Sequence, residues 1–383
     1  MNRYLTTCIF SALLVLTSVC RAQNPYDLPD GLYTEIKTEA GLVVCELFYQ
    51  QVPMTVINHI CLAEGTLGPR EKRGKPFYDG LTWCRVVPGL VVQGGDPLGT
   101  GAGDAGYLFP DEIVPGLRHE AMGTLQMGND GPDTNGSQFC LMLSAQHRLN
   151  YQHNVFGRVV RGLEILPKIK QGDTMLVKIL RLGAEAKAFA ADEGTFKKLV
   201  AQSSRYPGPG EPGPNAPFDD PDKILPLEWD RAKQFNFKLV NFHRFRGIKL
   251  AARLYANHPP AAAGEKLEAW LQAESMRLGV DQRGALAVYF ADADKFHVRI
   301  GAVSMDHFLA TTPTGEKCPP ALSIDEALGA LFKAADEGAA KTIATLQARL
   351  TPDDPMTEQR KIKLQADALI DGLIFKLEKS ASK

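Results

Sequence analysis

The stretch of sequence that decides the fold is Trp83–Asp96, which reads WCRVVPGLVVQGGD. Two short apolar segments, 83–87 and 91–94, lie on either side of Pro88-Gly89, a pair typical of turns. We therefore expect two short strands here. Arg85 lies among apolar neighbours on the first strand, and a lone arginine needs a face on which its N–H donors find partners.

Further short strands are expected on both sides of this stretch. Period-two alternation and turn residues predict strands at 32–38, 42–47, 124–127, 139–143, 155–160 and 175–182. Helical spacing of apolar residues predicts two helices, 52–63 and 163–170. Many short strands combined with two helices predict a mainly β domain, a closed barrel capped at its ends by these helices.

The chain has 383 residues, which is too long for one average domain. After the N-terminal segment 1–22 we expect a compact domain at 30–184 and a helical extension at 185–202. The next segment, 203–226, holds seven prolines and three glycines, a composition typical of a stiff, extended linker. Residues 227–383 are expected to form a separate C-terminal domain.

This C-terminal region mixes both periodicities. Strands are expected at 284–291 and 295–300. Helices are expected at 266–277, 324–350 and 358–377. The pattern predicts an α/β domain.

The N-terminus has the pattern of an export signal. Arg3 precedes an apolar run at 8–19, which is too short to span a bilayer, and Cys20-Arg21-Ala22 follows. Residues 1–22 are therefore predicted to be a signal peptide, and the mature protein is predicted to be periplasmic or secreted. Lipidation of Cys20 is the alternative, and Val19 before it disfavours this processing. No later stretch is apolar for long enough to predict a membrane span.

Composition excludes several classes of function. Lys and Arg total 43 and Asp and Glu total 44, which gives a formal net charge of -1. A near-neutral chain lacks the positive field that non-specific nucleic-acid binding needs, so no nucleic-acid partner is expected. The seven cysteines form no CxxC pair and the eight histidines no HExxH motif, so no metal and no cofactor are expected. We expect the cysteines outside the signal peptide to be buried free thiols.

Polar side chains on the predicted strands indicate a binding site. Arg85, Gln93 and Gln138 can meet on one face of the barrel. An apolar wall would come from Leu90, Val91 and Leu149. An apolar pocket with few convergent donors favours a neutral, partly apolar ligand. The alternatives are a surface ion pair for Arg85, buried amides that tie loops for the two glutamines, and a structural loop role for His153.

Two other motifs do not carry chemistry. Gly101–Gly106 matches the dinucleotide-binding pattern, but Pro110 stops the helix that such a site requires, so we expect a flexible loop. Ser137 has neither an adjacent base nor a nucleophile elbow. Serine hydrolase chemistry is therefore not supported.

Together, the segments 85–96, 131–139 and 155–157 resemble the cyclophilin-type peptidyl-prolyl cis-trans isomerases, in particular their bacterial branch. The similarity is nearly colinear from Leu32 to Leu182. It implies an eight-stranded antiparallel closed barrel with two capping helices. It also implies catalysis of rotation about X–Pro bonds, with proline-containing polypeptides as the substrates.

The resemblance implies roles for individual residues. Arg85 matches the catalytic arginine of the family, and Gln93 matches the glutamine that holds the substrate carbonyl. Asn129 matches the asparagine whose backbone binds the peptide. The other matching positions line the substrate groove: Leu90, Val91, Gly128, Gln138, Cys140, Leu149 and His153.

Several groove positions depart from the family pattern. Leu90, Cys140 and Arg148 stand where the family often has aromatic residues, and Cys84 stands where it usually has histidine. Loss of aromatic surface weakens the capture of proline. Two hypotheses follow: an exported isomerase that assists protein folding, or a proline-peptide binding adaptor with little turnover.

The C-terminal region offers a third class of function, a structural or signalling role. Segment 265–300 resembles the TPM-type domain of exported bacterial proteins, most closely at 278–290, which reads LGVDQRGALAVYF. The alternative is an α/β domain of another kind that binds clients or a partner protein.

Overall fold

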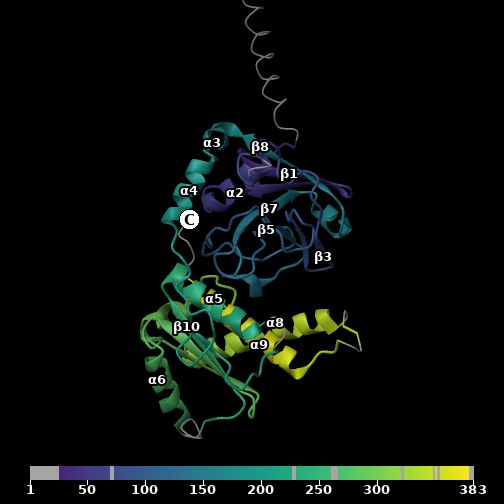
Figure 1. The fold of residues 1–383 in the computed structure, drawn as a ribbon. Coiled ribbons are helices and arrows are strands. Elements are labelled where there is room, and N and C mark those ends of the chain that lie inside the picture. Colours follow the sequence, from purple (N-terminus) through teal and green to yellow (C-terminus); the bar gives the residue numbers. More distant parts are fainter. Residues whose placement is uncertain are drawn as a thin grey trace, which may run out of the picture.

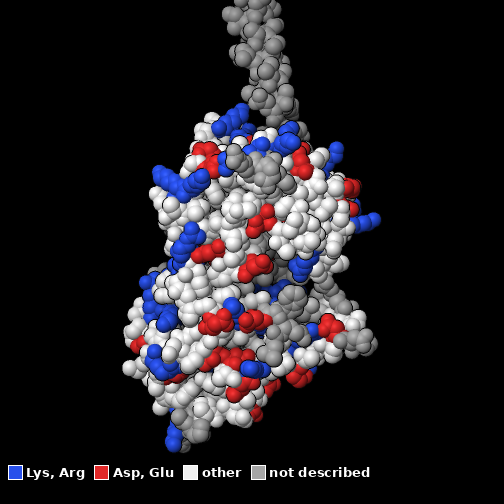
Figure 2. All heavy atoms as spheres, viewed as in Figure 1, with Lys and Arg blue, Asp and Glu red and all other residues white. Residues whose placement is uncertain are grey.

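The computed structural model describes residues 26–69, 73–226, 230–259, 266–320, 323–347, 350–351 and 354–378. The predicted signal peptide, 1–22, lies outside the described residues. Figure 1 shows two lobes, with the N-terminal lobe in purple to blue and the C-terminal lobe in green to yellow. Acidic and basic side chains intermingle on the face shown in Figure 2, in keeping with the balanced charge of the sequence.

The N-terminal lobe is built on one eight-stranded antiparallel sheet. In hydrogen-bonded order its strands are β3 (Arg85–Val87), β4 (Val91–Gly94), β6 (Phe139–Met142), β5 (Thr124–Met127), β7 (Val155–Arg161), β2 (Gly41–Leu47), β1 (Gly31–Thr38) and β8 (Met175–Leu182). Each neighbouring pair runs antiparallel. All eight lie where the sequence predicts strands, although β3 begins two residues later than expected.

The sheet curls, but the closed barrel expected from the sequence is not confirmed. Among the described residues, β3 and β8 at its two edges form no ladder with each other. The segments that precede them meet instead through an isolated bridge between Thr82 and Thr174. Backbone hydrogen bonds of 2.9 Å, Trp83 N to Asp173 O and Met175 N to Leu81 O, flank this bridge. Strand β3 is three residues long, and all three of its residues pair with β4. The two edges of the sheet therefore meet only through the short contact at Thr82 and Thr174.

One predicted capping helix is confirmed and the other differs. Helix α2 (Pro53–Ala63) starts with Pro53 in its first turn and is almost wholly buried. The second, predicted at 163–170, is the 3-10 helix η4 (Leu163–Lys168). Pro167 within it has no N–H to donate, which disfavours a regular α-helix over so short a segment.

The predicted helical extension consists of two helices rather than one. These are α3 (Gly183–Ala188) and α4 (Glu193–Gln202). Asp192 caps α4 by accepting a hydrogen bond of 2.8 Å from the Thr195 N–H. Phe196 of α4 packs its ring against Phe109, so this extension belongs to the core of the N-terminal lobe.

The C-terminal lobe is a three-layer α/β structure. Its sheet has the order β12 (Lys295–Ile300), β11 (Gly284–Phe290), β10 (Lys249–Tyr255) and β9 (Phe218–Asp219). Helices α5 (Arg231–Arg246), α7 (Met305–Leu309), α8 (Ile324–Gln347) and α9 (Glu358–Leu377) share one core with one face of the sheet. Helix α6 (Leu267–Arg277) covers the opposite face.

Part of the expected linker, 203–226, is built into this lobe. Strand β9 lies within it and pairs in parallel with β10. The fully buried guanidinium of Arg253 donates hydrogen bonds of 2.9–3.1 Å to the carbonyl oxygens of Pro214, Ala216 and Pro217. A proline-rich segment leaves many carbonyls without an N–H partner, and Arg253 supplies donors for them.

No helix in the described part of the chain is both long and apolar enough to cross a membrane.

Candidate active site

Strand register places the predicted site residues in one row on the sheet. Arg85 of β3 lies directly opposite Gln93 of β4, and Gln93 lies directly opposite Cys140 of β6. Directly opposed residues share a face of the sheet. The alternate residues of the same strands, Val92 and Leu141, lie in the hydrophobic core of the lobe. The row from Arg85 to Cys140 therefore lies on the outer face of the sheet.

A chain of amide hydrogen bonds fixes the polar groups in this row. Gln138 donates its Nε2 to the carbonyl oxygens of Gly101 and Gly103, each at 2.9 Å. Its Oε1 is thereby turned toward Gln93, whose Nε2 donates to it at 2.6 Å. Gln93 Oε1 then accepts from Arg85 Nη1 at 3.4 Å. Two carbonyls of the 101–106 loop thus set the orientation of both glutamines.

The Arg85 side chain remains open to solvent. It is exposed and donates a long hydrogen bond of 3.4 Å to Gln93. Among the described residues, no carboxylate forms an ion pair with its guanidinium. Since arginine carries five N–H donors, most of them stay available to a ligand on this face.

An apolar cluster lies beside Arg85 on the same face. Its buried members are Val91, Cys140 and Met142, and Leu90 and Leu149 pack against them. Leu149 comes from the 3-10 helix η3 (His147–Leu149). Burial raises the pKa of the Cys140 thiol to about 12, although the nearby Arg85 charge opposes this shift. Cys140 is therefore a neutral, apolar group in this cluster and not a nucleophile.

Loop residues form the next part of the site. The Gly128 N–H donates to the Gln138 carbonyl oxygen at 2.9 Å, which places Gly128 beside the amide chain. Asn129 donates its Nδ2 to the Gln152 carbonyl oxygen at 2.9 Å and to Asn135 Oδ1 at 3.3 Å. These bonds hold the 128–129 backbone at the rim of the row.

His153 is neutral at physiological pH. Its Nδ1 lies 3.2 Å from the Met127 carbonyl oxygen, an acceptor, so this nitrogen carries the proton. Burial lowers the pKa of His153 to about 4, although this hydrogen bond opposes the shift. The ring therefore forms a wall of the site and does not act as an acid or base near neutral pH.

The amide chain of Arg85, Gln93 and Gln138 shares a surface with the apolar cluster, because Gln93 lies opposite Cys140. Gly128 donates a hydrogen bond to Gln138, and Asn129 and His153 line a cavity together. Cavities adjoin this surface on two sides, and both are shared with the C-terminal lobe. One, of about 440 Å³, lies next to Asn129 and His153 and includes Phe237 of α5. The other, of about 320 Å³, lies next to Leu90 and includes Leu346 of α8.

Several neighbours of this surface were missed by sequence reasoning. Asp367 and Asp371 of α9 line a cavity together with Arg148, and their carboxylates favour its charged form. Gly101 and Gly103 contribute backbone carbonyl oxygens, and the sequence does not indicate where a backbone carbonyl points. Phe237 and Asp230 lie about a hundred residues away along the chain from Asn129. No local pattern connects them to the site.

The described residues contain no cluster of three metal-ligating side chains. The five described cysteines, Cys45, Cys61, Cys84, Cys140 and Cys318, are free thiols, and the first four are buried.

The sequence and structure of the N-terminal lobe are similar to those of known proteins. The family described as cyclophilin type peptidyl-prolyl cis-trans isomerase/CLD matches residues 33–184. A peptidyl-prolyl cis-trans isomerase of Helicobacter pylori is 40% identical over 149 residues, which cover 38% of this chain and 85% of the relative. One from Arabidopsis thaliana is 39% identical over 146 residues, which cover 37% of this chain and 83% of the relative. The crystal structure of a cyclophilin type isomerase from Cryptosporidium parvum is 30% identical and covers 40% of this chain and 98% of its own, with a TM-score of 0.35.

The chain therefore belongs to the family of cyclophilin-type peptidyl-prolyl cis-trans isomerases. This membership rests on the N-terminal lobe, because the family match ends at residue 184.

Proposed function

We propose that this protein catalyses rotation about X–Pro peptide bonds at the outer face of β3, β4 and β6, with Arg85 as the catalytic residue. One observation carries the proposal. An exposed guanidinium lies beside an apolar cluster, and two glutamines whose amides are fixed in orientation support it.

The proposed mechanism is transition-state stabilisation without a covalent step. Rotation of an amide passes over a barrier of about 18–20 kcal/mol because conjugation is lost on the way. The prolyl nitrogen becomes pyramidal as its lone pair leaves conjugation, and Arg85 donates a hydrogen bond to it. The hydrogen bond from Arg85 strengthens as the X–Pro peptide bond twists. It therefore stabilises the twisted state more than either the cis or the trans ground state.

Neighbouring groups would position the substrate. Val91, Cys140 and Leu149 cover the proline ring and exclude water from it. Gln93 and the backbone at Asn129 hold one side of the peptide while the other side rotates. Gln138 is a positioning residue, since it acts through Gln93.

The test is an exchange measurement by NMR on a short Ala-Pro peptide with the full chain at substoichiometric concentration. We expect the cis and trans resonances to exchange much faster than without protein. The NMR measurement uses no coupling protease, so the exchange rate reports the rotation of the X–Pro bond directly.

A second candidate, a proline-peptide binding adaptor, is favoured by one observation. The cluster beside Arg85 contains no aromatic side chain, because Leu90 and Cys140 stand where an aromatic residue is usual in the family. In the same experiment an adaptor would show saturable shifts of the peptide resonances without faster exchange. That outcome would replace the isomerase proposal.

We further propose that the protein is exported and assists protein folding outside the cytoplasm. The pattern at 1–22 supports export, because a short apolar run follows Arg3 and ends at Cys20-Arg21-Ala22. Mass spectrometry of the mature protein from a periplasmic or culture fraction should find Gln23 as the first residue. Retention of Met1 would contradict the proposal, and a lipid-modified Cys20 would favour the lipoprotein alternative.

A further inference from the structure

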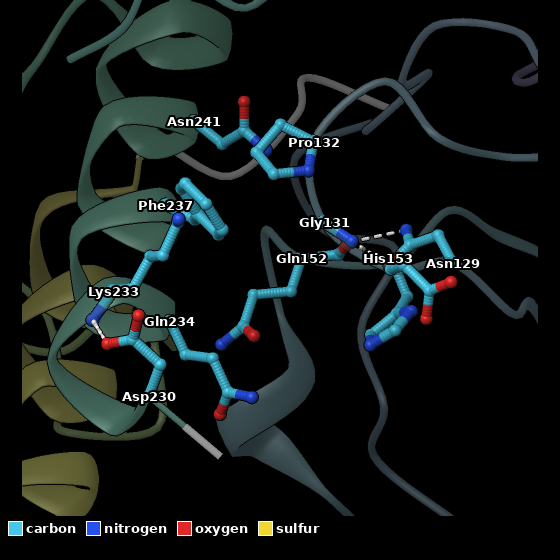
Figure 3. A pocket seen from close by; sticks show the side chains of 11 residues that line it. Asn129, Gly131, Pro132, Gln152, His153, Asp230, Lys233, Gln234, Phe237 and Asn241 are labelled. Carbon is cyan, nitrogen blue, oxygen red and sulfur yellow. Dashed lines mark hydrogen bonds between the residues drawn. The ribbon is translucent and has the colours of Figure 1, made fainter. Parts of the chain in front are cut away.

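The cavity of about 440 Å³ beside Asn129 and His153 lies between the two lobes. The N-terminal lobe supplies one wall through the loops at 129–132 and 152–153. The first turns of α5 supply the other, from Asp230 to Asn241. Figure 3 shows Phe237 and Gln234 on one side facing Gln152 and Pro132 across this space. The volume is in the range of small-ligand pockets, and the cavity shares Asn129 and His153 with the proposed groove.

The walls of this cavity are held in place by buried polar contacts. Asn241 of α5 donates its Nδ2 to Asp111 Oδ2 at 3.1 Å and to the Tyr151 carbonyl oxygen at 3.0 Å. Arg244, one turn further along, forms an ion pair of 2.9 Å with Asp133, and both side chains are largely buried. Buried charge-assisted contacts of this kind resist separation, because breaking one leaves an uncompensated charge. The cavity is therefore preformed and not an occasional gap between lobes.

An aromatic ring forms part of the α5 wall of the cavity. Phe237 packs edge to face against Tyr206, with the ring centroids 5.6 Å apart. A Cβ atom built on Gly131 would lie 3.4 Å from the Phe237 ring, so the ring lies directly over this loop. The ring offers an apolar surface to the stem of a long side chain, and the Lys233 ammonium lies over its π face, 5.8 Å from the ring centroid.

The charged groups at the cavity favour a cation. Asp130 and Asp230 are exposed carboxylates on opposite walls. Lys233 is the cationic residue of the lining, and its ammonium already forms an ion pair of 2.6 Å with Glu211. With Lys233 neutralised in this way, the two carboxylates dominate the local field.

We propose that this cavity is a substrate subsite, shared by the two lobes, that binds an arginine or lysine side chain close to the proline. The subsite rests on the proposed isomerase function and adds to it a preference supplied by the C-terminal lobe. The cationic head pairs with Asp130 and Asp230, and the stem packs on Phe237.

The test compares peptides that differ at one position next to the Ala-Pro unit. Arginine, glutamine and glutamate are placed in turn on each side, and kcat/KM for the full chain is measured by NMR exchange at low salt. We expect the arginine peptide to exceed the glutamine peptide by about three- to tenfold on one side, as for partly exposed ion pairs with ring contact. The glutamate peptide should be the poorest of the three.

Variants assign the preference to the cavity. Asp230→Asn keeps the cap of α5, because asparagine caps as well as aspartate, but it removes the charge. Together with Asp130→Asn it should bring the arginine peptide down to the level of the glutamine peptide. Phe237→Leu keeps an apolar side chain and should reduce the preference in part. Asp336→Asn, exposed on α8 away from the cavity, is the matched control and should leave the preference intact.

The outcomes separate this inference from the proposed function. Turnover of all three peptides at equal rates would overturn the subsite and leave the isomerase proposal standing. If no peptide is turned over, dissociation constants for the same peptides decide the matter. Equal constants would overturn the subsite, and a preference for arginine that the Asp130 and Asp230 variants abolish would support it.

Discussion

Arg85 owes its availability to a neutral hydrogen-bond partner, Gln93, which is itself fixed in orientation. Gln138 is held by two loop carbonyls, Gln93 is held by Gln138, and Gln93 offers Arg85 an oxygen and not a charge. A carboxylate in place of Gln93 would bind the guanidinium more tightly and withhold its donors. Because Gln93 is neutral, it leaves the N–H donors of Arg85 free to form hydrogen bonds with the transition state.

The residue that most limits proline capture is expected to be Cys140. It lies in the apolar cluster, and its small side chain leaves ring surface uncovered. Cys140→Phe adds aromatic area at this position, and we expect KM for an Ala-Pro peptide to fall by about three- to tenfold with kcat little changed. Steady-state NMR exchange rates over a range of peptide concentrations give both constants.

Cys140→Ser serves as the control, since it keeps the size and adds no aromatic surface. An unchanged KM for Cys140→Phe, in a protein that unfolds at the same urea concentration as the parent, would contradict this role for the pocket wall.

At the scale of elements, most of the N-terminal lobe follows from local sequence. Strong alternation and clear turns predict all eight strands, and Pro53 predicts the start of α2. The 3-10 geometry of η4 was not predicted, because apolar spacing alone does not separate one turn type from another. Whether the sheet closes depends on a contact between segments some ninety residues apart, Thr82 and Thr174, and no local pattern encodes it.

Helix α5 shows the same limit in the C-terminal lobe. Its buried residues Phe235, Leu239 and Phe242 have helical spacing, and Gly247 follows its last turn, so the sequence does contain a pattern that predicts this helix.

Some site residues can be predicted from local sequence, and others depend on contacts between distant parts of the chain. The family motifs predict the residues of the proposed groove, whereas the cavity beside α5 depends on how two lobes dock.

The N-terminus of α2 offers a test at this scale. Its N-cap residue, Val52, has no polar side chain, and Glu112 from a distant loop accepts from the N–H groups of Met54 and Thr55 at 3.0 and 2.7 Å. Glu112→Gln replaces one acceptor by an NH2 group facing these donors. We expect it to lower the free energy of unfolding by about 1–3 kcal/mol, as measured by urea denaturation.

Glu337→Gln on the exposed face of α8 is the matched control and should have almost no effect. Equal stability of the Glu112 and Glu337 variants would show that Glu112 is not the cap of α2.

For the whole molecule, the two lobes dock through buried charges and a shared core. Ile113 and Tyr151 of the N-terminal lobe belong to the hydrophobic core of the C-terminal lobe. Glu378 accepts hydrogen bonds from both Tyr151 and Arg118 across the boundary. The proline-rich segment 203–226 therefore joins lobes that already pack against each other.

A buried ion pair beside this boundary is expected to matter for stability. Lys238 of α5 pairs with Asp371 of α9, and both side chains are buried, with Lys238 fully so. Lys238 also donates to the Arg148 carbonyl oxygen of the N-terminal lobe, at 3.4 Å. Asp371→Asn leaves the ammonium without its carboxylate and should cost about 3–5 kcal/mol of unfolding free energy.

The double variant Lys238→Met with Asp371→Leu removes both charges and should recover most of this loss, as followed by urea denaturation. If the double variant were as unstable as Asp371→Asn, the uncompensated charge would not be the cause.

Arg85 is proposed to promote rotation of the X–Pro bond. The most direct test is the NMR exchange rate of an Ala-Pro peptide with the parent chain and with Arg85→Ala, together with the peptide dissociation constant of each. Arg85 is exposed and its removal should leave the fold intact. We expect the exchange rate to fall by about 10²–10³-fold, as for loss of one transition-state donor, while the dissociation constant changes little. An Arg85→Ala chain that exchanges the peptide as fast as the parent would contradict the account.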